Sequence, residues 1–323
     1  SDYTSNYSFA STLTGLTLGS SSNTANITLN TATSIAGNVG LYGGNVVLDN
    51  ALTTTNSGII RLQATTGTVS QNASGVVTTN GLAFMGGNAA LTTAANNVTT
   101  LAAQNMGNLS FVNAGNLTVA HVNPVGINAT GAVSISTQTG DLTITEAIVT
   151  TSNASNALVL NAGSTIAAGT ATGGNILISG NATGNIIVGS GGLAVLYTGS
   201  VANSTGVATL VGNGSGNFRY DSNATSQGYT LALASNGTVA VYREQPSLTV
   251  TAGGNVTYGN AVPLTFTAVN GDTLAQIFGS SQPSASAVNG SYSTSGNLNV
   301  GNYAVSVTAG NLTSQLGYAS PTF

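Results

Sequence analysis

Short stretches in which apolar and polar residues alternate recur between residues 26 and 189 of the chain. Gly, Asn, Ser and Thr separate them, and alternation with a period of two over about four to eight residues is typical of β-strands. The segments lie at 26–37, 45–55, 58–69, 75–86, 108–122, 132–149, 157–166 and 175–189. Their loose spacing of about 20–25 residues indicates a repeat architecture.

The repeats predict a right-handed parallel β-helix. In such a fold, successive coils stack at about 4.8 Å, and side chains alternate between a narrow core and solvent. Residues 24–215 are expected to form about eight or nine coils. Helical periodicity is nearly absent, so the Ala-rich segment 89–103 is also interpreted as sheet. The pairs expected to point inward are Val46/Leu48, Ile60/Leu62, Leu142/Ile144 and Ile176/Ile178.

A transmembrane β-barrel is the rival architecture, because its strands also alternate. Barrels carry girdles of aromatic residues and strands of about ten residues. In this chain aromatic residues make up 6%, Trp is absent, and the apolar runs are short. The run of about 18 apolar residues that a transmembrane helix needs is absent as well. The pattern therefore favours the β-helix.

The pattern changes near residue 215, where Tyr and Phe become more frequent. Asn236-Gly237 is a two-residue hairpin signal, so we expect an antiparallel hairpin to cap the stack there. From Pro246 onward, longer runs predict a small Ig-like β-sandwich with strands at 247–252, 255–259, 263–269, 291–295 and 303–309. The expected organisation is a strand or cap segment at 1–23, the β-helix at 24–245 and the sandwich at 246–323.

The sandwich is expected to be incomplete, because the chain stops at Phe323, where its last strand should start. A missing strand leaves an edge of unpaired N–H and C=O groups over an apolar groove. Either a continuation of the chain or a neighbouring copy then covers this edge. Continuation is the favoured alternative, and the alternating segment 7–18 is the candidate donor for the other.

Composition excludes many functions. Only 3 Lys+Arg and 7 Asp+Glu occur among 323 residues, or 3% charged, whereas an ordinary soluble domain has roughly 25%. The three arginines lie far apart, so no basic cluster is available for nucleic acid or phosphate. One His and no Cys cannot build a zinc, haem or iron–sulfur site. Neither a cofactor nor a metal is predicted, and nucleic acid is not an expected partner.

The ionisable residues of the repeats are interpreted as structural. Asp141 and Glu146 are the closest carboxylates, but positions five apart in a strand point to opposite faces and cannot flank one bond. His121 has no Cys, Glu or second His beside it, and a Ser nucleophile would need a base that an acid orients. No catalytic residue is therefore predicted, and no ligand-binding residue is identified.

The remaining charges and the Gly-rich strings are also interpreted as structural. Asp49, Asp221 and Asp272 lie in turn-like contexts, where an Asx turn accounts for an acid. Arg243 and Glu244 are expected to form pairs across the junction between the two domains. The strings at 189–192 and 212–216 are predicted to be turns with positive φ, since a phosphate loop needs a Lys.

Asn-x-Ser/Thr sequons are numerous, although the abundance of Ser and Thr supplies many by chance. Glycosylation of their Asn residues is therefore left open. The sequon residues are Asn26, Asn72, Asn97, Asn108, Asn116, Asn128, Asn153, Asn181 and Asn223.

Two groups of motifs carry a family resemblance. The segments GGNVVLDNA (43–51), NAGNLTVAHV (113–122) and TGDLTITEAIV (139–149) resemble repeats of filamentous-haemagglutinin-type exoproteins, which use two-partner secretion. The segments VYREQPSLTV (241–250), VTYGNAVPLTFTAVNGDT (256–273) and VGNYAVSVTAGNLTS (300–314) resemble the repeats called MBG, of YGX type. The resemblance covers nearly all of the chain apart from about 20 N-terminal residues, without the family's N-terminal secretion domain. It implies secretion to the surface of a Gram-negative bacterium, a filamentous stalk, and adhesion or biofilm-matrix roles.

The leading hypothesis is a non-enzymatic extracellular adhesin or matrix-filament segment, in which an all-β rod presents a binding surface away from the cell. Its expected partners are a glycan or protein on a host or neighbouring cell, or other copies of itself, and it does not span the membrane. One alternative is a fibre subunit that assembles by end stacking or strand exchange. Another is a carbohydrate-active enzyme on the same scaffold, which the scarcity of charged residues disfavours.

Overall fold

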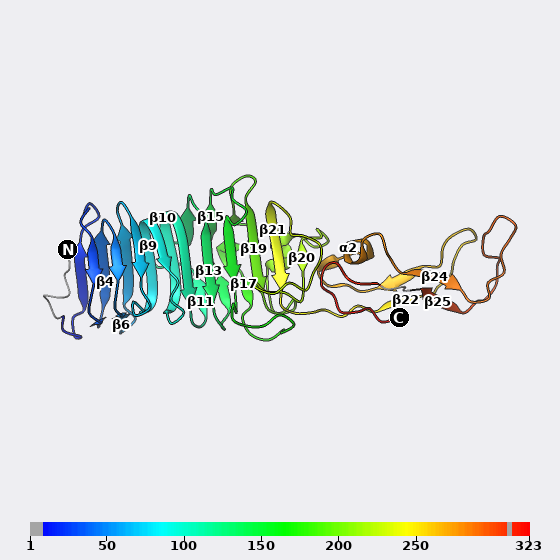
Figure 1. Ribbon diagram of the computed structural model, residues 1–323, viewed down its shortest axis with the longest axis horizontal. Coiled ribbons are helices and arrows are strands. Elements are labelled where there is room, and N and C mark those ends of the chain that lie inside the picture. The colour runs from blue at the N-terminus through cyan, green and yellow to red at the C-terminus, as the bar shows by residue number, and fades with distance from the viewer. Residues whose placement is uncertain (1–8, 309–311) are drawn as a thin grey trace.

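Parallel strands stacked along one axis make up most of the chain, which the computed structural model describes at residues 9–308 and 312–323 (Figure 1). They form a β-solenoid of about ten turns, and its strands stack in three columns of unequal length. At about 4.8 Å per turn, this rod is roughly 48 Å long. A smaller part with short antiparallel sheets continues the long axis of the molecule beyond the last rung.

The first column begins with β1, which lies inside the segment expected to be terminal. Its strands pair in parallel register, Gly15 with Asn38 and Val39 with Ile60. The column consists of β1 (Gly15–Gly19), β4 (Asn38–Gly43), β7 (Ile59–Ala64), the middle parts of β9 (Val77–Leu91) and β10 (Asn97–Asn113), β12 (Ile127–Ala129), β15 (Ile148–Thr150) and β18 (Ile186–Ile187).

The second column runs the whole length of the rod and ends with the last rung. It consists of β2 (Ile27–Leu29), β5 (Val46–Leu48), β8 (Thr68–Gln71), the last parts of β9 and β10, β13 (Val133–Thr137), β16 (Leu158–Asn161), β19 (Leu193–Thr198) and β21 (Gly237–Tyr242). The short β20 (Phe218–Arg219) also pairs with β21 in parallel. Rungs β1 and β21 lie outside 24–215, so the solenoid extends beyond the expected range at both ends.

The third column is the shortest. It consists of β3 (Thr33–Ile35), β6 (Leu52–Thr54), the first parts of β9 and β10, β11 (Leu117–Val119), β14 (Leu142–Ile144) and β17 (Ile176–Ile178). Beyond β17 the coils contain the 3-10 turn η1 (Gly180–Ala182) and the helix α1 (Val207–Val211). Strands β9 and β10 each turn through all three columns, and Gly86 and Gly87 bend β9 with positive φ.

The core of the solenoid confirms the predicted alternation. All four pairs expected to point inward are buried, with Val46, Leu48, Ile60 and Leu62 at 0% exposure. The Ala-rich segment 89–103 is indeed sheet, divided between β9 and β10. Between 45 and 149 every strand pairing is parallel, and the one antiparallel contact is an isolated bridge from His121 to Val125. The prediction of a parallel stack is therefore correct.

A ladder of asparagine side chains joins the coils at the start of the second column. The Asn26 Oδ1 accepts a hydrogen bond from the Asn45 N–H at 3.0 Å, and the Asn45 Oδ1 accepts from the Thr68 N–H at 2.9 Å. Farther along, the Asn88 Oδ1 accepts from the Asn108 N–H at 2.7 Å. Each bond satisfies a backbone donor at a corner, where the sheet ladder is interrupted. The recurring Gly-Asn dipeptide therefore has a structural cause.

The predicted capping hairpin at Asn236-Gly237 is wrong. Gly237, with φ +84°, starts the last rung β21, which pairs in parallel with β19 and β20. The segment before it, 229–234, does not pair with β21. Instead Tyr229, Leu233 and Ala234 pack against Val239 and its neighbours on the outside of the sheet. Burial of the outer apolar side chains of β19 and β21 thus outweighs the local hairpin preference.

The end of the rod is capped by segments of the C-terminal part. Helix α2 (Leu274–Phe278) follows the 3-10 turn η2 (Val269–Gly271) and buries Leu274, Ile277 and Phe278 in the continuous core. Leu316 and Tyr318 return from the far end of the chain and join the same core. The helix was not predicted, although Thr273 and Gln276 form a capping box that the sequence displays.

Two small antiparallel sheets form the rest, which is consistent with a small β-sandwich. Strand β22 (Val250–Ala252) pairs with β23 (Leu264–Phe266), and β24 (Ser284–Ala287) pairs with β25 (Val305–Thr308). Three of the five expected strands are thus present. The other two, at 255–259 and 291–295, lie in loops, apart from an isolated bridge between Tyr292 and Leu298.

The second edge of β22 is occupied by the last residues of the chain. The Thr322 N–H donates to the Leu248 carbonyl, and the Val250 N–H donates to the Thr322 carbonyl, both at 2.9 Å. Residues 319–322 therefore already lie beside β22, whereas the missing strand was expected to start at Phe323. Of the proposed donor segment 7–18, residues 7 and 8 lie outside the described part, and residues 15–18 belong to rung β1.

The three arginines yield a test of the stack. Arg61 and Arg219 lie within strands β7 and β20, and Arg243 directly follows β21. Because trypsin needs a locally unfolded segment, we expect the native chain to survive conditions that cut the unfolded chain into four fragments. Mass spectrometry of timed digests measures this. Rapid native cleavage after Arg61 would contradict the stacked coil at β7.

Candidate functional site

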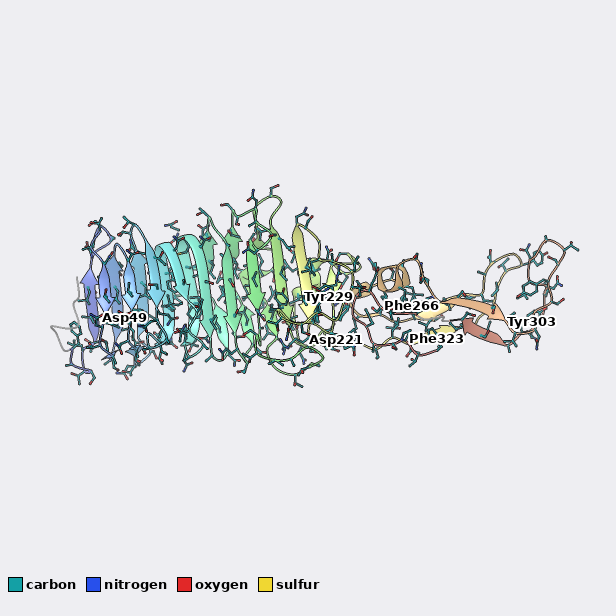
Figure 2. The ribbon with its side chains drawn as sticks, viewed as in Figure 1. Asp49, Asp221, Tyr229, Phe266, Tyr303 and Phe323 are labelled. Atoms are coloured by element: carbon teal, nitrogen blue, oxygen red, sulfur yellow. The ribbon has the colours of Figure 1, made fainter. Side chains whose placement is uncertain are left out.

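The acidic side chains are dispersed along the molecule. Figure 2 shows Asp49 in the N-terminal part of the rod and Asp221 near its C-terminal end. The Asp49 carboxylate accepts a hydrogen bond from the Asn72 side chain, and Asp221 accepts from Gln245. Among residues 9–308 and 312–323, no group of three His, Asp or Glu side chains is placed to hold a metal ion.

Asp141 belongs to a second ladder, at the start of the third column. Its N–H donates to the Asn116 Oδ1 at 2.9 Å, and its own Oδ1 accepts from the Asn175 N–H at 2.7 Å. The Asn175 Oδ1 then accepts from the Ser200 N–H. Asp141 thus occupies a position where the neighbouring coils have Asn. The Glu146 carboxylate accepts from the Asn181 side chain instead, so the two carboxylates have separate partners, consistent with their structural interpretation.

Several sequon residues take part in the same structural contacts. Asn26 and Asn108 belong to the first ladder, and Asn116 belongs to the second. The Asn223 side chain donates to the Ile166 carbonyl and accepts from the backbone of Ser226. These asparagines therefore have roles in the fold that are independent of any modification.

Arg243 binds backbone carbonyls rather than a carboxylate. Its side chain is 1% exposed, and Nη1 donates to the Ala162 carbonyl at 2.6 Å. Nη2 donates to the carbonyls of Gly173 and Gly174, the latter at 3.0 Å. Burial lowers the pKa of Arg243 to about 10, so the guanidinium stays charged at neutral pH. It closes the long loop at 162–175, where a widened coil leaves these carbonyls without strand partners.

The other arginines have the same kind of contact. Arg219, 2% exposed, donates to the carbonyls of Gly216, Leu231 and Ala232 at 2.6–2.8 Å and lies 5.6 Å from the ring centre of Tyr229. Arg61 donates to the carbonyls of Val122 and Asn123 at 3.3–3.4 Å, next to the loop that contains the exposed His121. Arg243 and Glu244 were each expected to pair across the junction, and this prediction is wrong, because the side-chain partners of both lie within the solenoid. Backbone carbonyls surround the guanidinium, and Glu244 accepts from the Val201 N–H.

The Gly-rich strings are turns, as predicted. Gly191 in the first string, and Gly212, Gly214 and Gly216 in the second, have φ between +74° and +91°. The short helix α1 lies before the second string and not after it. Neither string therefore precedes a helix in the way that a phosphate loop does.

A buried polar cluster lies where the rod meets the C-terminal part. Asp272 is 3% exposed, and its Oδ2 accepts hydrogen bonds from the hydroxyls of Tyr220 at 2.7 Å and Tyr318 at 2.9 Å. The ring of Tyr220 stacks on Tyr242 with centroids 5.7 Å apart. Asp272 is therefore not a solvated turn residue. The preceding Asn270-Gly271 turn, with positive φ at both residues, carries the acid into the core.

This cluster predicts a pH dependence. Burial raises the pKa of Asp272 above its ordinary value of 3.8, and hydrogen bonds from Tyr220 and Tyr318 and the charge of Arg219 oppose the rise. A folded state with the higher pKa holds the proton more tightly than the unfolded state. The contribution of Asp272 to stability is therefore largest below pH 3.8 and is lost as the pH rises through the raised value.

We expect D272N to make the thermal midpoint less dependent on pH above 4, because the amide keeps an acceptor and does not ionise. Circular dichroism of both proteins across this range measures the midpoint. As a control, S286A removes a hydrogen bond between the exposed hydroxyls of Ser286 and Ser306, touches no ionisable group and should leave the slope unchanged. An identical slope in wild type and D272N would contradict the assignment.

A cleft lies at the far end of the C-terminal part, between the loop at 253–263 and the loop that precedes β25. Its volume is about 430 Å³. Tyr258 and Tyr303 line it together with Val300 and the amide side chains of Asn255, Asn260, Asn299 and Asn302. Figure 2 shows Tyr303 at the end of the molecule that is distant from the solenoid. The cleft was not predicted, because it depends on two loops that the sequence placed partly in strands.

Comparisons of the chain with protein-family models, with curated proteins and with solved structures find no match. The fold is therefore what defines its class: an all-β protein in which a parallel β-solenoid is followed by small antiparallel sheets. Within the described residues, no helix has the length and apolar character needed to cross a lipid bilayer.

Proposed function

We propose that this chain is a non-enzymatic extracellular adhesin or matrix-filament segment of the filamentous-haemagglutinin type, with a C-terminal module of the MBG type. The observation that carries the proposal is the arrangement in Figure 1, where a solenoid places a small loop-rich part at one end of a rod. A stack of parallel coils is stiff because each coil bonds to both neighbours. Such a rod can hold a binding surface away from the cell to which it is attached.

The described polar groups support a mechanical role over a catalytic one. Both buried arginines bind carbonyls, Asp141 replaces a ladder asparagine, and Asp272 is enclosed by tyrosines. A hydrolase on this scaffold would need a pair of carboxylates in one accessible cleft. The cleft at the far end has no charged residue in its lining.

The test is adhesion of the chain attached to beads through its N-terminus. Beads with folded chain should be retained under flow by a layer of bacterial or epithelial cells. Beads with heat-unfolded chain are the matched control. Equal retention of both would overturn the proposal, as would turnover of an oligosaccharide by the folded chain.

A self-assembling fibre subunit is the second candidate, and one observation favours it. Rung β1 pairs with β4, and its other edge has no partner among the described strands. Such an edge can add another strand. Sedimentation velocity distinguishes the two candidates: a sedimentation coefficient that rises with concentration supports assembly, and a constant monomer value contradicts it.

A further inference from the structure

We propose that the cleft between the 253–263 loop and the loop preceding β25 is a binding site for a neutral saccharide. This inference rests on the proposed adhesive function and assigns it a ligand class. It depends on three features of the cleft: its lack of charge, its exposed aromatic and apolar side chains, and its unengaged amides.

The absence of charge selects the kind of ligand. From Ser247 to Phe323, Asp272 is the only charged side chain, and it is buried in the junction with the rod. Neither an anionic nor a cationic ligand would find an opposite charge in the cleft. A ligand that binds here must therefore be neutral and must gain affinity from contacts and hydrogen bonds.

Exposed apolar side chains are concentrated around this cleft. Tyr258 is 53% exposed and Val300 is 94% exposed, and both line it. Of the eleven large apolar residues that are exposed in the described chain, seven lie between Ser247 and Phe323, and four of these line the cleft: Val256, Tyr258, Val300 and Val305. Exposed clusters of this kind mark binding surfaces on soluble proteins. A tyrosine ring offers a flat apolar face and a polar tip, which suits a sugar ring with C–H groups on one face and hydroxyls at its edge.

The amides supply the polar contacts. Asn255, Asn260 and Asn302 are exposed, and their side chains make no hydrogen bond with another described residue. An amide carries both a donor and an acceptor, so it can bond to a hydroxyl in either role. Tyr258 is positioned by the bond from its hydroxyl to the Ser293 Oγ at 2.9 Å, which joins the two loops.

The size and shape of the cleft favour a saccharide over a peptide strand. Its volume of about 430 Å³ is within the usual range for small-ligand sites, about 300–1,000 Å³. Peptides that add to a sheet need a continuous unpaired strand edge. Most of the lining comes from loops, with only Ala287 and Val305 from strands. The end of a neutral oligosaccharide is therefore the ligand we infer.

The experiment uses the full chain and four neutral trisaccharides as probes: maltotriose, cellotriose, mannotriose and N,N′,N″-triacetylchitotriose. Saturation-transfer NMR titrations give the dissociation constants. We expect at least one probe to bind the wild type and Y258A to weaken it at least about tenfold, as for an aromatic residue central to a contact. Y292A is the matched control, because Tyr292 is also 53% exposed but does not line the cleft. Y258F keeps the ring without the bond to Ser293 and should retain binding.

Other outcomes overturn the inference. No binding of any probe to the wild type at millimolar concentration would do so, as would an equal loss of binding in Y292A. Tighter binding of 3′-sialyllactose than of every neutral probe, or of a neutral tetrapeptide with the same dependence on Tyr258, would also contradict it. The bead assay, run with wild-type and Y258A chains, tells the two proposals apart. If wild-type beads are retained by cells but the wild type binds no saccharide probe, only the ligand assignment is overturned. If the wild type binds a saccharide probe but its beads are not retained, only the adhesive function is overturned.

Discussion

R243M is expected to destabilise the solenoid by about 3–5 kcal/mol, because it removes the donors for several buried carbonyls at once. The guanidinium binds Ala162, Gly173 and Gly174, which lie 69–81 residues earlier in the chain. Methionine fills much of the same volume but donates no hydrogen bond. The change therefore isolates the polar contacts from the loss of packing.

The matched control is R61M. Arg61 also donates to backbone carbonyls, but at 3.3–3.4 Å and from a half-exposed position where water can replace it. We expect its loss to cost about 0–1 kcal/mol. Denaturant midpoints of the two variants measure the difference, and hydrogen exchange should show faster exchange in residues 162–175 of R243M. Similar midpoints for the two variants would show that the contacts of Arg243 contribute little.

The strands of the rod were predictable because their cause is local. Alternation of apolar residues decides which side chains enter the core, and Val46, Leu48, Ile60 and Leu62 needed only this rule. The Gly-Asn dipeptides at 44–45, 87–88 and 107–108 likewise recur because these coils share the same corner. The division into three columns was not predicted, since it depends on which strand of each coil pairs with which strand of the preceding coil.

The contacts of the junction depend on residues far apart in the sequence. Tyr220 and Asp272 are 52 residues apart, and neither shows locally that it will be buried with the other. The hairpin at Asn236-Gly237 was wrong for a related reason, since β19 supplies a partner for β21 that a local signal does not reveal. Helix α2 is different, because the capping box of Thr273 and Gln276 was present in the sequence.

The cleft could not be predicted from the pattern. Its residues come from two loops about 40 residues apart, and loops have no period to follow. The composition did contain one usable signal. A long segment with Asp272 as its single charged residue, yet with Tyr258, Tyr292 and Tyr303, differs from the solenoid, where Tyr is rare before residue 197.

G107A is expected to destabilise the chain by about 1–3 kcal/mol, because the position before the ladder residue Asn108 has no room for a side chain. A Cβ on Gly107 would lie 2.3 Å from the Asn88 Oδ1, which accepts the hydrogen bond from the Asn108 N–H. Either the amide moves and the bond breaks, or the coils separate. Gly107 has no positive φ, so backbone strain does not contribute to the cost.

A double-mutant cycle identifies the cause. N88A alone should cost about 0.5–2 kcal/mol, since it leaves one backbone donor without its partner. In the N88A background the clash is absent, so the added cost of G107A should fall by at least about 0.5 kcal/mol. G115A is the control, because nothing lies within 4 Å of its Cβ, and it should change stability by no more than about 0.5 kcal/mol. Additive costs for N88A and G107A would mean that the ladder does not require the glycine, and the Gly-Asn repeat would then need another explanation.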